Sequence, residues 1–340
     1  MTGVPGTAIL ALDIGGTKIA AGVVLLGTDS AEVLLPHSVP TNAVRGGAAV
    51  CNTVVDLALR VAREYRALPS ASELAGIAVA SAGVVDEETG SIISATELIP
   101  GWAGTALGAA LEDALSLPSQ ILNDVHAHAL GEVKMGAGAG VDSALVIAVG
   151  TGMGGAIVSG GEVLRGVHWV SGNLGHIHHS LARDFTCSCG RVGHIEAVAS
   201  GSGITALYNA RADEARLPHV DGGRALQELA DGGNVLAQQT FVDSGRALGE
   251  VLGSLANATD PEVIILSGSM TRSGDAWWGA VHDGYRASAI NPVLGTPIVH
   301  GTLAGDAPLL GAVANFLMSS TNERTSHTPR ELRKKNALDH

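Results

Sequence analysis

Short apolar runs interrupted by glycine-rich turns occur twice in this chain. Apolar runs flank the turn IGGTK between residues 8 and 26, and similar runs flank the turn GTGMGG between residues 144 and 161. Two apolar runs joined by a short turn that contains glycine are typical of a β-hairpin. Because the pattern is repeated, we predict a duplicated architecture in which each half contributes one turn to a shared cleft.

The rest of the pattern predicts helices and buried strands. Apolar residues at helical spacing predict helices, and short uninterrupted apolar runs predict strands. An Asn or Asp before good helix formers marks a helix start near residue 124. Helices are predicted at 48–68, 124–135, 196–216, 224–258 and 306–318, and strands at 74–85 and 263–266. Residues 319–340 are polar and lack apolar periodicity, which predicts a flexible tail.

The length of 340 residues and the order of these elements predict two domains. We expect an N-terminal α/β domain over 1–121, completed by the last helix at about 306–318. A larger α/β domain is expected over 122–305, inserted before that helix. The fold class is therefore α/β with a cleft between two domains.

Composition then narrows the classes of protein. The formal net charge of -13 opposes attraction to nucleic acid or anionic lipid, because a surface that follows phosphates needs clustered Lys and Arg. With no apolar run of about 18 residues and no secretory signal, we expect a soluble cytoplasmic protein without a membrane partner. Only three cysteines occur, two of them in a C-x-C pair, which fits a reducing compartment and a metal site.

The turn of the first hairpin is a candidate phosphate loop. It reads D-x-G-G-T-K and contains Asp13, Gly15, Gly16, Thr17 and Lys18. Paired glycines let backbone N–H groups approach phosphate oxygens, the Thr hydroxyl adds a donor, and the Asp carboxylate can hold Mg²⁺ through its water shell. An ordinary hairpin turn is the alternative interpretation of this segment.

The second hairpin favours the phosphate interpretation. Its turn contains Gly150, Thr151 and Gly152 and matches G-x-G-x-x-G, the dinucleotide fingerprint. That fingerprint requires a helix next, whereas the following residues AIVSGG predict a strand. The sequence also lacks a G-x-x-x-x-G-K-[ST] loop, so a phosphate clamp made of two hairpins remains.

Five motifs, in order, resemble the ROK family of bacterial sugar kinases and sugar-responsive repressors. They are LDIGGTK, LND at 122–124, AVGTGMGG, GHIHH and CSCGRVGHIEAVASG. The resemblance implies a two-domain actin-like (ribonuclease H-like) ATPase fold, ATP and Mg²⁺ as cofactors, a sugar substrate and a homodimer. It also implies that Gly268, after the strand at 263–266, lies near the adenine.

The resemblance further implies phosphoryl transfer to the 6-hydroxyl of a hexose or N-acylhexosamine. Phosphoryl transfer needs a carboxylate that accepts the proton of the attacking hydroxyl, and the resemblance gives this role to Asp124. The alternative is that Asp124 only caps the helix that follows, and both roles are compatible. The sugar-binding residues that the resemblance implies are Gly83, Asn123, Asp124, His176 and Glu196.

His176 enters this set through an alignment of the family pattern G-x-x-G-E-x-G-H onto residues 172–179. The alignment puts His176 at the Glu position and His179 at the metal-binding His. N-acetylmannosamine kinases of this family also accept His at the Glu position, so the resemblance favours N-acetylmannosamine as the substrate. The alternative is a glucokinase in which His176 replaces the Glu of the family pattern.

A short segment carries four candidate zinc ligands, which are His179, Cys187, Cys189 and His194. Four N/S ligands in a glycine-rich loop match a closed structural zinc site. The resemblance implies a third Cys at position 194, so His there changes the ligand set to Cys₂His₂. Use of His176 as a ligand is an alternative, and Cys51 is expected to be a small core residue.

A sugar-responsive repressor is the main rival from another class. Repressors of the family carry a helix-turn-helix module before the first hairpin, and here the first strand begins within the first ten residues. The acidic charge balance also disfavours binding to DNA. We therefore expect no nucleic-acid partner.

Overall fold

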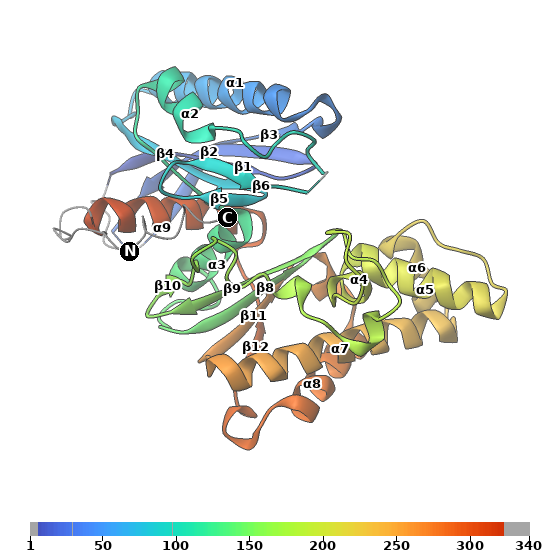
Figure 1. The fold of residues 1–340 in the computed structure, drawn as a ribbon. Coiled ribbons are helices and arrows are strands. Elements are labelled where there is room, and N and C mark those ends of the chain that lie inside the picture. Colours follow the sequence, from blue (N-terminus) through green and yellow to red (C-terminus); the bar gives the residue numbers. More distant parts are fainter. Residues whose placement is uncertain (1–5, 29, 97, 323–340) are drawn as a thin grey trace, which may run out of the picture.

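The computed structural model describes residues 6–28, 30–96 and 98–322, which form two α/β units that meet at helices α3 and α9 (Figure 1). The first unit is built on a five-stranded sheet in the order β3-β2-β1-β4-β7. Its strands are β1 Ala8–Ile14, β2 Lys18–Leu26, β3 Ala31–Pro40, β4 Leu74–Ser81 and β7 Ser119–Asn123. Helices α1 Gly47–Arg66 and α2 Leu107–Leu115 cover its outer face, and β5 Val84–Asp86 pairs with β6 Ser91–Ser94 beside it.

The second unit repeats this sheet in the order β10-β9-β8-β11-β12. Its strands are β8 Ala144–Val149, β9 Met153–Ser159, β10 Glu162–Val163, β11 Val263–Ser267 and β12 Ile298–His300. The helices on its outer side are α4 Glu196–Ala199, α5 Gly201–Ala215, α6 Gly223–Asp231, α7 Val235–Thr259 and α8 Asp275–Ser288. In each sheet an antiparallel hairpin precedes two parallel strands, so the predicted duplication is confirmed.

Two helices fill the space between the sheets. They are α3 Asp124–Met135 and α9 Ala307–Asn322, and they pack on each other. The apolar cluster around them combines residues of both sheets, including Ile9, Ala78, Val146 and Ile265. Burial of this shared cluster joins the two units, because removing apolar surface from water is the main favourable contribution to folding.

The strand register of the first sheet brings the carboxyl ends of β1, β4 and β7 side by side. Ile14 of β1 pairs with Ser81 of parallel β4, and Ser81 pairs with Asn123 of parallel β7. The three strands therefore end side by side, and the residues at or beyond their carboxyl ends converge at one edge. This edge is where ligands bind in open α/β sheets.

Several helix boundaries differ from the predictions. The helix predicted at 196–216 is interrupted at Ser200, which is extended and caps α5 by accepting a hydrogen bond from the Gly203 N–H. The helix predicted at 224–258 is interrupted before Asn234, which caps α7 in the same way. Periodicity alone missed both interruptions, because side-chain caps compete with a continuous helix without changing the apolar spacing.

The domain limits stay a prediction, although β7 extends to Asn123 and so continues past the predicted boundary after residue 121. Helix α9 extends to Asn322, whereas the remainder of the predicted tail, 323–340, lies outside the described residues. Within the described part of the chain, no helix combines the length and the apolar character that a bilayer crossing requires.

Candidate active site

Asp13 and Asp124 lie together where the parallel strands of the first sheet end. Asp13 is next to last in β1, and Asp124 follows β7 directly as the first residue of α3. Burial and the nearby Asp124 carboxylate together raise the pKa of Asp13 to about 7, against the lowering effect of Lys18. Burial also raises the pKa of Asp124, against the N–H groups of Val125 and Asn123 that favour its ionised form. A carboxylate with a raised pKa is a stronger proton acceptor.

Asn123, and not Asp124, caps helix α3. The Asn123 Oδ1 accepts hydrogen bonds from the N–H groups of Val125 and His126, at 3.0 and 3.1 Å. Its Nδ2 donates to the Gly83 carbonyl and to Asp124 Oδ1, both at 2.9 Å. Asn123 is therefore the N-cap, although Asp124 Oδ1 also accepts from the Val125 N–H at 2.9 Å. Asn123 holds both the Gly83 turn and the Asp124 carboxylate in place.

The pKa of Asp13 predicts a pH-dependent stability. Between about pH 4 and pH 7 the folded protein keeps a proton on Asp13 that the unfolded chain releases, so this group costs stability as the pH rises through that range. Asp13→Asn should stabilise the metal-free protein, and by roughly 2 kcal/mol more at pH 8 than at pH 5.

Thermal unfolding in EDTA at the two pH values measures this effect. Asp113→Asn, which changes an exposed carboxylate on α2, is the matched control and should show no such difference. Equal effects of Asp13→Asn at pH 5 and pH 8 would contradict the raised pKa of Asp13.

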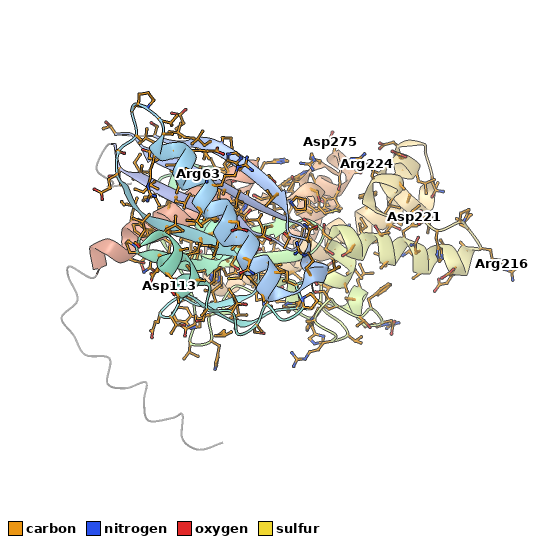
Figure 2. The ribbon with its side chains drawn as sticks, turned by 90° about the horizontal axis from the view of Figure 1, so that it is seen from above. Arg63, Asp113, Arg216, Asp221, Arg224 and Asp275 are labelled. Carbon is orange, nitrogen blue, oxygen red and sulfur yellow. The ribbon has the colours of Figure 1, made fainter. Side chains whose placement is uncertain are left out.

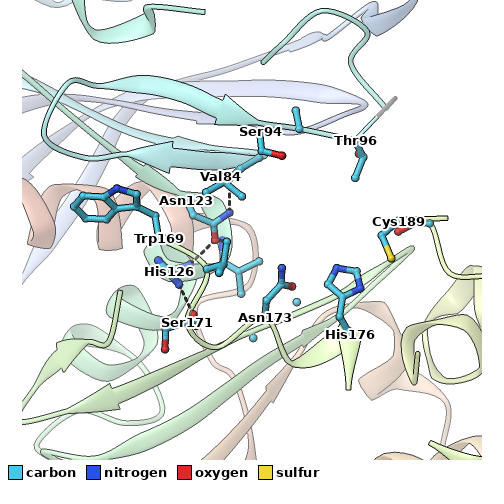
Figure 3. A pocket seen from close by; sticks show the side chains of 17 residues that line it. Val84, Ser94, Thr96, Asn123, His126, Trp169, Ser171, Asn173, His176 and Cys189 are labelled. Carbon is cyan, nitrogen blue, oxygen red and sulfur yellow. Dashed lines mark hydrogen bonds between the residues drawn. The ribbon is translucent and has the colours of Figure 1, made fainter. Parts of the chain in front are cut away.

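A cavity of about 510 Å³ lies beside Asn123, between the two units (Figure 3). Among the predicted sugar-binding residues, Gly83, Asn123 and His176 line it, whereas Asp124 and Glu196 are not among the described lining residues. Sequence analysis missed the other polar and aromatic lining side chains, which are Ser94, Thr96, His126, Trp169, Ser171, Asn173 and Ser188. The cavity is large enough for a hexose with a substituent.

His126 was assigned no role from the sequence, and in the structure it connects helix α3 to Ser171. Its side chain is buried, and its Nε2 donates to the Ser171 carbonyl at 2.9 Å. Burial lowers the pKa of His126, which favours the neutral ring. The contact ties helix α3 to the segment that forms the cavity wall opposite β5 and β6.

Glu196 faces the hairpin backbone. Its Oε2 accepts from the Met153 N–H at 2.9 Å, and its Oε1 accepts from the Ser188 hydroxyl at 2.6 Å. Burial alone would raise the pKa of Glu196, but these hydrogen bonds outweigh it and the pKa is lowered. Glu196 is thus linked to the 510 Å³ cavity through Ser188, which lines it.

Four side chains form a compact group that could hold a metal ion. They are His176, Cys187, Cys189 and His194, and their ligand atoms all lie within 4.8 Å of one another. The two Nδ1 atoms are 3.2 Å apart, and the distance from Nδ1 to Sγ is 3.4 Å for His176 and Cys187 and 3.3 Å for His194 and Cys189. A tetrahedron around zinc has edges of about 3.3 Å between nitrogens and about 3.8 Å between sulfurs, so this set fits a Cys₂His₂ site.

His179 lies outside this group of described residues, which corrects its assignment as a ligand. Its Nε2 is 3.0 Å from Glu250 Oε2, and its Nδ1 accepts from the Leu181 N–H at 3.2 Å. The family pattern G-E-x-G-H also matches GNLGH at 172–176, which aligns His176, a member of the group of four, with the His of the pattern. Asn173 then occupies the Glu position, and its place in the cavity wall agrees with this register.

The environment of Cys187 does not favour a reactive thiolate. Burial and the neighbouring Glu196 carboxylate raise the pKa of Cys187 to about 12. Nucleophilic cysteines instead have a lowered pKa in an electropositive site. Cys51 on α1 is partly buried, and burial raises its pKa as well.

A second cavity, of about 660 Å³, lies beside the second glycine turn. It is lined by Thr151, by the start of α5 at Ser202, and by Ser269, Met270, Arg272 and Ser273, which follow the predicted adenine residue Gly268. Gly268 has φ 93°, and a Cβ there would lie 2.4 Å from the Val149 carbonyl oxygen, so only glycine fits between β8 and β11. The backbone N–H groups of Gly201 and Ser202 donate to the carbonyl oxygens of Gly150 and Thr151, which fixes the turn at the N-terminus of α5.

Charged side chains flank this second cavity. Asp221 and Arg224 line it at the start of α6, and Arg272 lines it from the segment after β11. Figure 2 shows Asp221 and Arg224 on the second unit, away from Arg63 and Asp113 on the first. Arginine beside a helix N-terminus suits an anionic ligand. The two glycine turns are alike in exposure, because Thr17 and Lys18 in the first and Thr151 and Gly152 in the second are all exposed. Each turn is closed by a backbone hydrogen bond, from the Gly15 N–H to the Lys18 carbonyl and from the Gly150 N–H to the Gly152 carbonyl.

Two α/β units with matching sheets, each carrying a glycine turn, define this chain as a member of the actin-like ATPase fold class. The sequence model of the ROK family matches residues 9–318, so the chain belongs to the ROK family.

Similar proteins include two sugar kinases. A glucokinase of Halalkalibacterium halodurans is 31% identical over 315 residues, covering 88% of this chain and 92% of that protein. An N-acetylmannosamine kinase of Shigella flexneri is 33% identical over 265 residues, covering 77% of this chain and 83% of that protein. The crystal structure of a ROK hexokinase from Thermus thermophilus superposes with a TM-score of 0.78 at 31% identity, covering 93% of this chain and all of that one.

Proposed function

We propose that this protein transfers the γ-phosphoryl group of ATP to the 6-hydroxyl of a sugar, with an N-acylhexosamine, and N-acetylmannosamine in particular, preferred over glucose. The observation that carries the proposal is the register of β1, β4 and β7, which brings Asp13, the Gly83 turn and Asp124 together beside the 510 Å³ cavity. Relatives named as glucokinase and as N-acetylmannosamine kinase support the reaction class.

Each residue has a role that its position supports. Asp124 accepts the proton of the attacking hydroxyl, and Asn123 holds that carboxylate at the start of α3. The turns at Gly15 to Lys18 and Gly150 to Gly152 offer N–H groups and hydroxyls to the phosphates of ATP. Asp13 would hold Mg²⁺, which neutralises phosphate charge when it is bound. Gly83, Asn123 and Asn173 line the cavity and would contact the sugar. Ser188 also lines it and donates a hydrogen bond to Glu196, which lies behind it.

The group of His176, Cys187, Cys189 and His194 is proposed to hold a structural zinc ion. His176 and Cys189 also line the sugar cavity, so an ion here would fix one wall of it. The ordering that zinc supplies suits a segment with little regular structure, because metal binding contributes directly to folding free energy.

The substrate preference is proposed to rest on Asn173 and no longer on His176. A Glu accepts hydrogen bonds from two hydroxyls, whereas an Asn amide both donates and accepts and can pair with the C=O and N–H of an acylamino group. Since an unpaired buried polar group costs about 1 to 3 kcal/mol, kcat/KM for N-acetylmannosamine should exceed that for glucose by roughly 5- to 150-fold.

An ATP-coupled assay with glucose, mannose, N-acetylglucosamine and N-acetylmannosamine tests this order, and NMR of the product identifies the phosphorylated hydroxyl. Asn173→Glu should shift the ratio toward glucose, whereas His179→Ala, outside the cavity, should leave it unchanged. Equal or better efficiency of the wild-type protein with glucose would replace the N-acylhexosamine proposal with a glucokinase.

A further inference from the structure

The segment from Arg165 to Ser171, here called the wall loop, is fixed against the first unit. Arg165 Nε donates to Glu87 Oε2 at 2.7 Å, and Nη2 donates to Asn315 Oδ1 on α9 at 2.5 Å. Side-chain exposure is only 24% for Arg165 and 10% for Glu87. A mostly buried ion pair with further hydrogen bonds holds its partners in one geometry. The loop of the second unit is thereby tied to the turn between β5 and β6.

The wall loop is also closed on itself. The Ser171 N–H donates to the Arg165 carbonyl at 3.1 Å, and the Ser171 carbonyl accepts from His126 Nε2 at 2.9 Å. Trp169 therefore sits in a loop whose two ends are both held, which limits the course of the backbone around it.

Trp169 has a backbone conformation that bulky residues rarely adopt. Its φ is 60°, in the left-handed region that glycine occupies without steric cost. Trp169 also lines the cavity, at the end away from His176 and Cys189 (Figure 3). A strained residue that surrounding contacts hold at a binding site is a candidate for a functional role.

We propose that Trp169 is a specificity-determining residue that contacts the acyl chain of a 2-acylamino hexose, and this inference rests on the proposed function. An indole presents a large apolar face, which suits the methyl end of a short acyl chain and not a bare hydroxyl. Asn173, in the same cavity wall, offers the amide donor and acceptor that the rest of the acylamino group requires. The two side chains together match a substituent that is polar at the sugar ring and apolar beyond it.

The test compares kcat/KM for N-acetylmannosamine and for mannose in Trp169→Gly. Because one apolar contact changes discrimination by about 10-fold or more, the variant should lose at least that factor with N-acetylmannosamine, mainly through KM, and less than about 2-fold with mannose. Its Tm should not fall, because glycine relieves the φ of 60°. Trp169→Phe keeps an aromatic face and should retain most of the preference.

Val167→Ala is the matched control, since Val167 lies in the wall loop, is 71% exposed and is not among the described cavity residues. Equal losses with both sugars, or no loss with either, would overturn the specificity role of Trp169 while leaving the kinase proposal intact. Absence of phosphorylation by the wild-type protein with every sugar would overturn the proposed function, and this inference with it.

Discussion

Asp124→Asn is expected to lower kcat by about 10² to 10⁴-fold, because the variant loses the proton acceptor that general-base catalysis requires. An amide has nearly the shape of the carboxylate it replaces. It can still contact Asn123 and the Val125 N–H, which lie 2.9 Å from Asp124 Oδ1. Binding of the sugar should therefore change by less than about 3-fold, so the loss should appear in kcat.

Steady-state kinetics at saturating ATP and calorimetric titration with the sugar separate these two effects. Asp56→Asn, at an exposed position on α1, removes one negative charge far from the reaction and serves as the control. A variant that keeps more than about a tenth of the wild-type kcat would rule out Asp124 as the base.

Cys187→Ala is expected to remove zinc from the protein and to raise the KM for the sugar by roughly 10- to 100-fold, the range in which loss of a supporting shell affects metal sites. The residue is buried, and its Sγ lies 3.4 Å from His176 Nδ1. His176 also lines the cavity, so loss of order in the group of four would directly change the part of the wall that contacts the sugar.

Two histidine variants give a sharper comparison. His176→Ala should also lose zinc, whereas His179→Ala should keep it, because His179 pairs with Glu250 outside the group of four. Elemental analysis of protein purified without chelators measures the metal content. Absence of zinc from the wild-type protein would end the zinc proposal, and loss of zinc only from His179→Ala would restore the assignment made from sequence.

The histidines show how a local pattern can identify a site and still misassign its members. GHIHH offers three His residues within four positions, and sequence analysis placed the metal ligand at His179. A short 3-10 turn over Leu174–His176 directs His176 toward Cys187, and an extended residue His179 then begins another turn. The sequence GNLGH at 172–176 also matches the family pattern, and this alignment agrees with the place of His176 in the group of four. The three nearby histidines made a later alignment look equally suitable.

Helix α3 shows the same limit in an element that was correctly predicted. The sequence predicted a helix at Asp124–Met135, and the structure has it there. Which of two adjacent polar residues caps that helix depends on the direction of each side chain at the end of β7. Asn123 accepts from the N–H groups of Val125 and His126, whereas Asp124, which also accepts from the Val125 N–H, lies beside Asp13. Side-chain composition does not contain this distinction.

The sequence by itself determined the duplicated hairpins, the α/β class and the ROK resemblance, because apolar spacing and glycine turns are local properties of the chain. Only the tertiary structure decided which residues meet. The positions of Asp13 and Asp124, the ion pair of Arg165 with Glu87, and the placement of Trp169 in the cavity all join segments far apart in the chain. Such contacts depend on strand register and on the packing of α3 between the sheets, and no local pattern specifies either one.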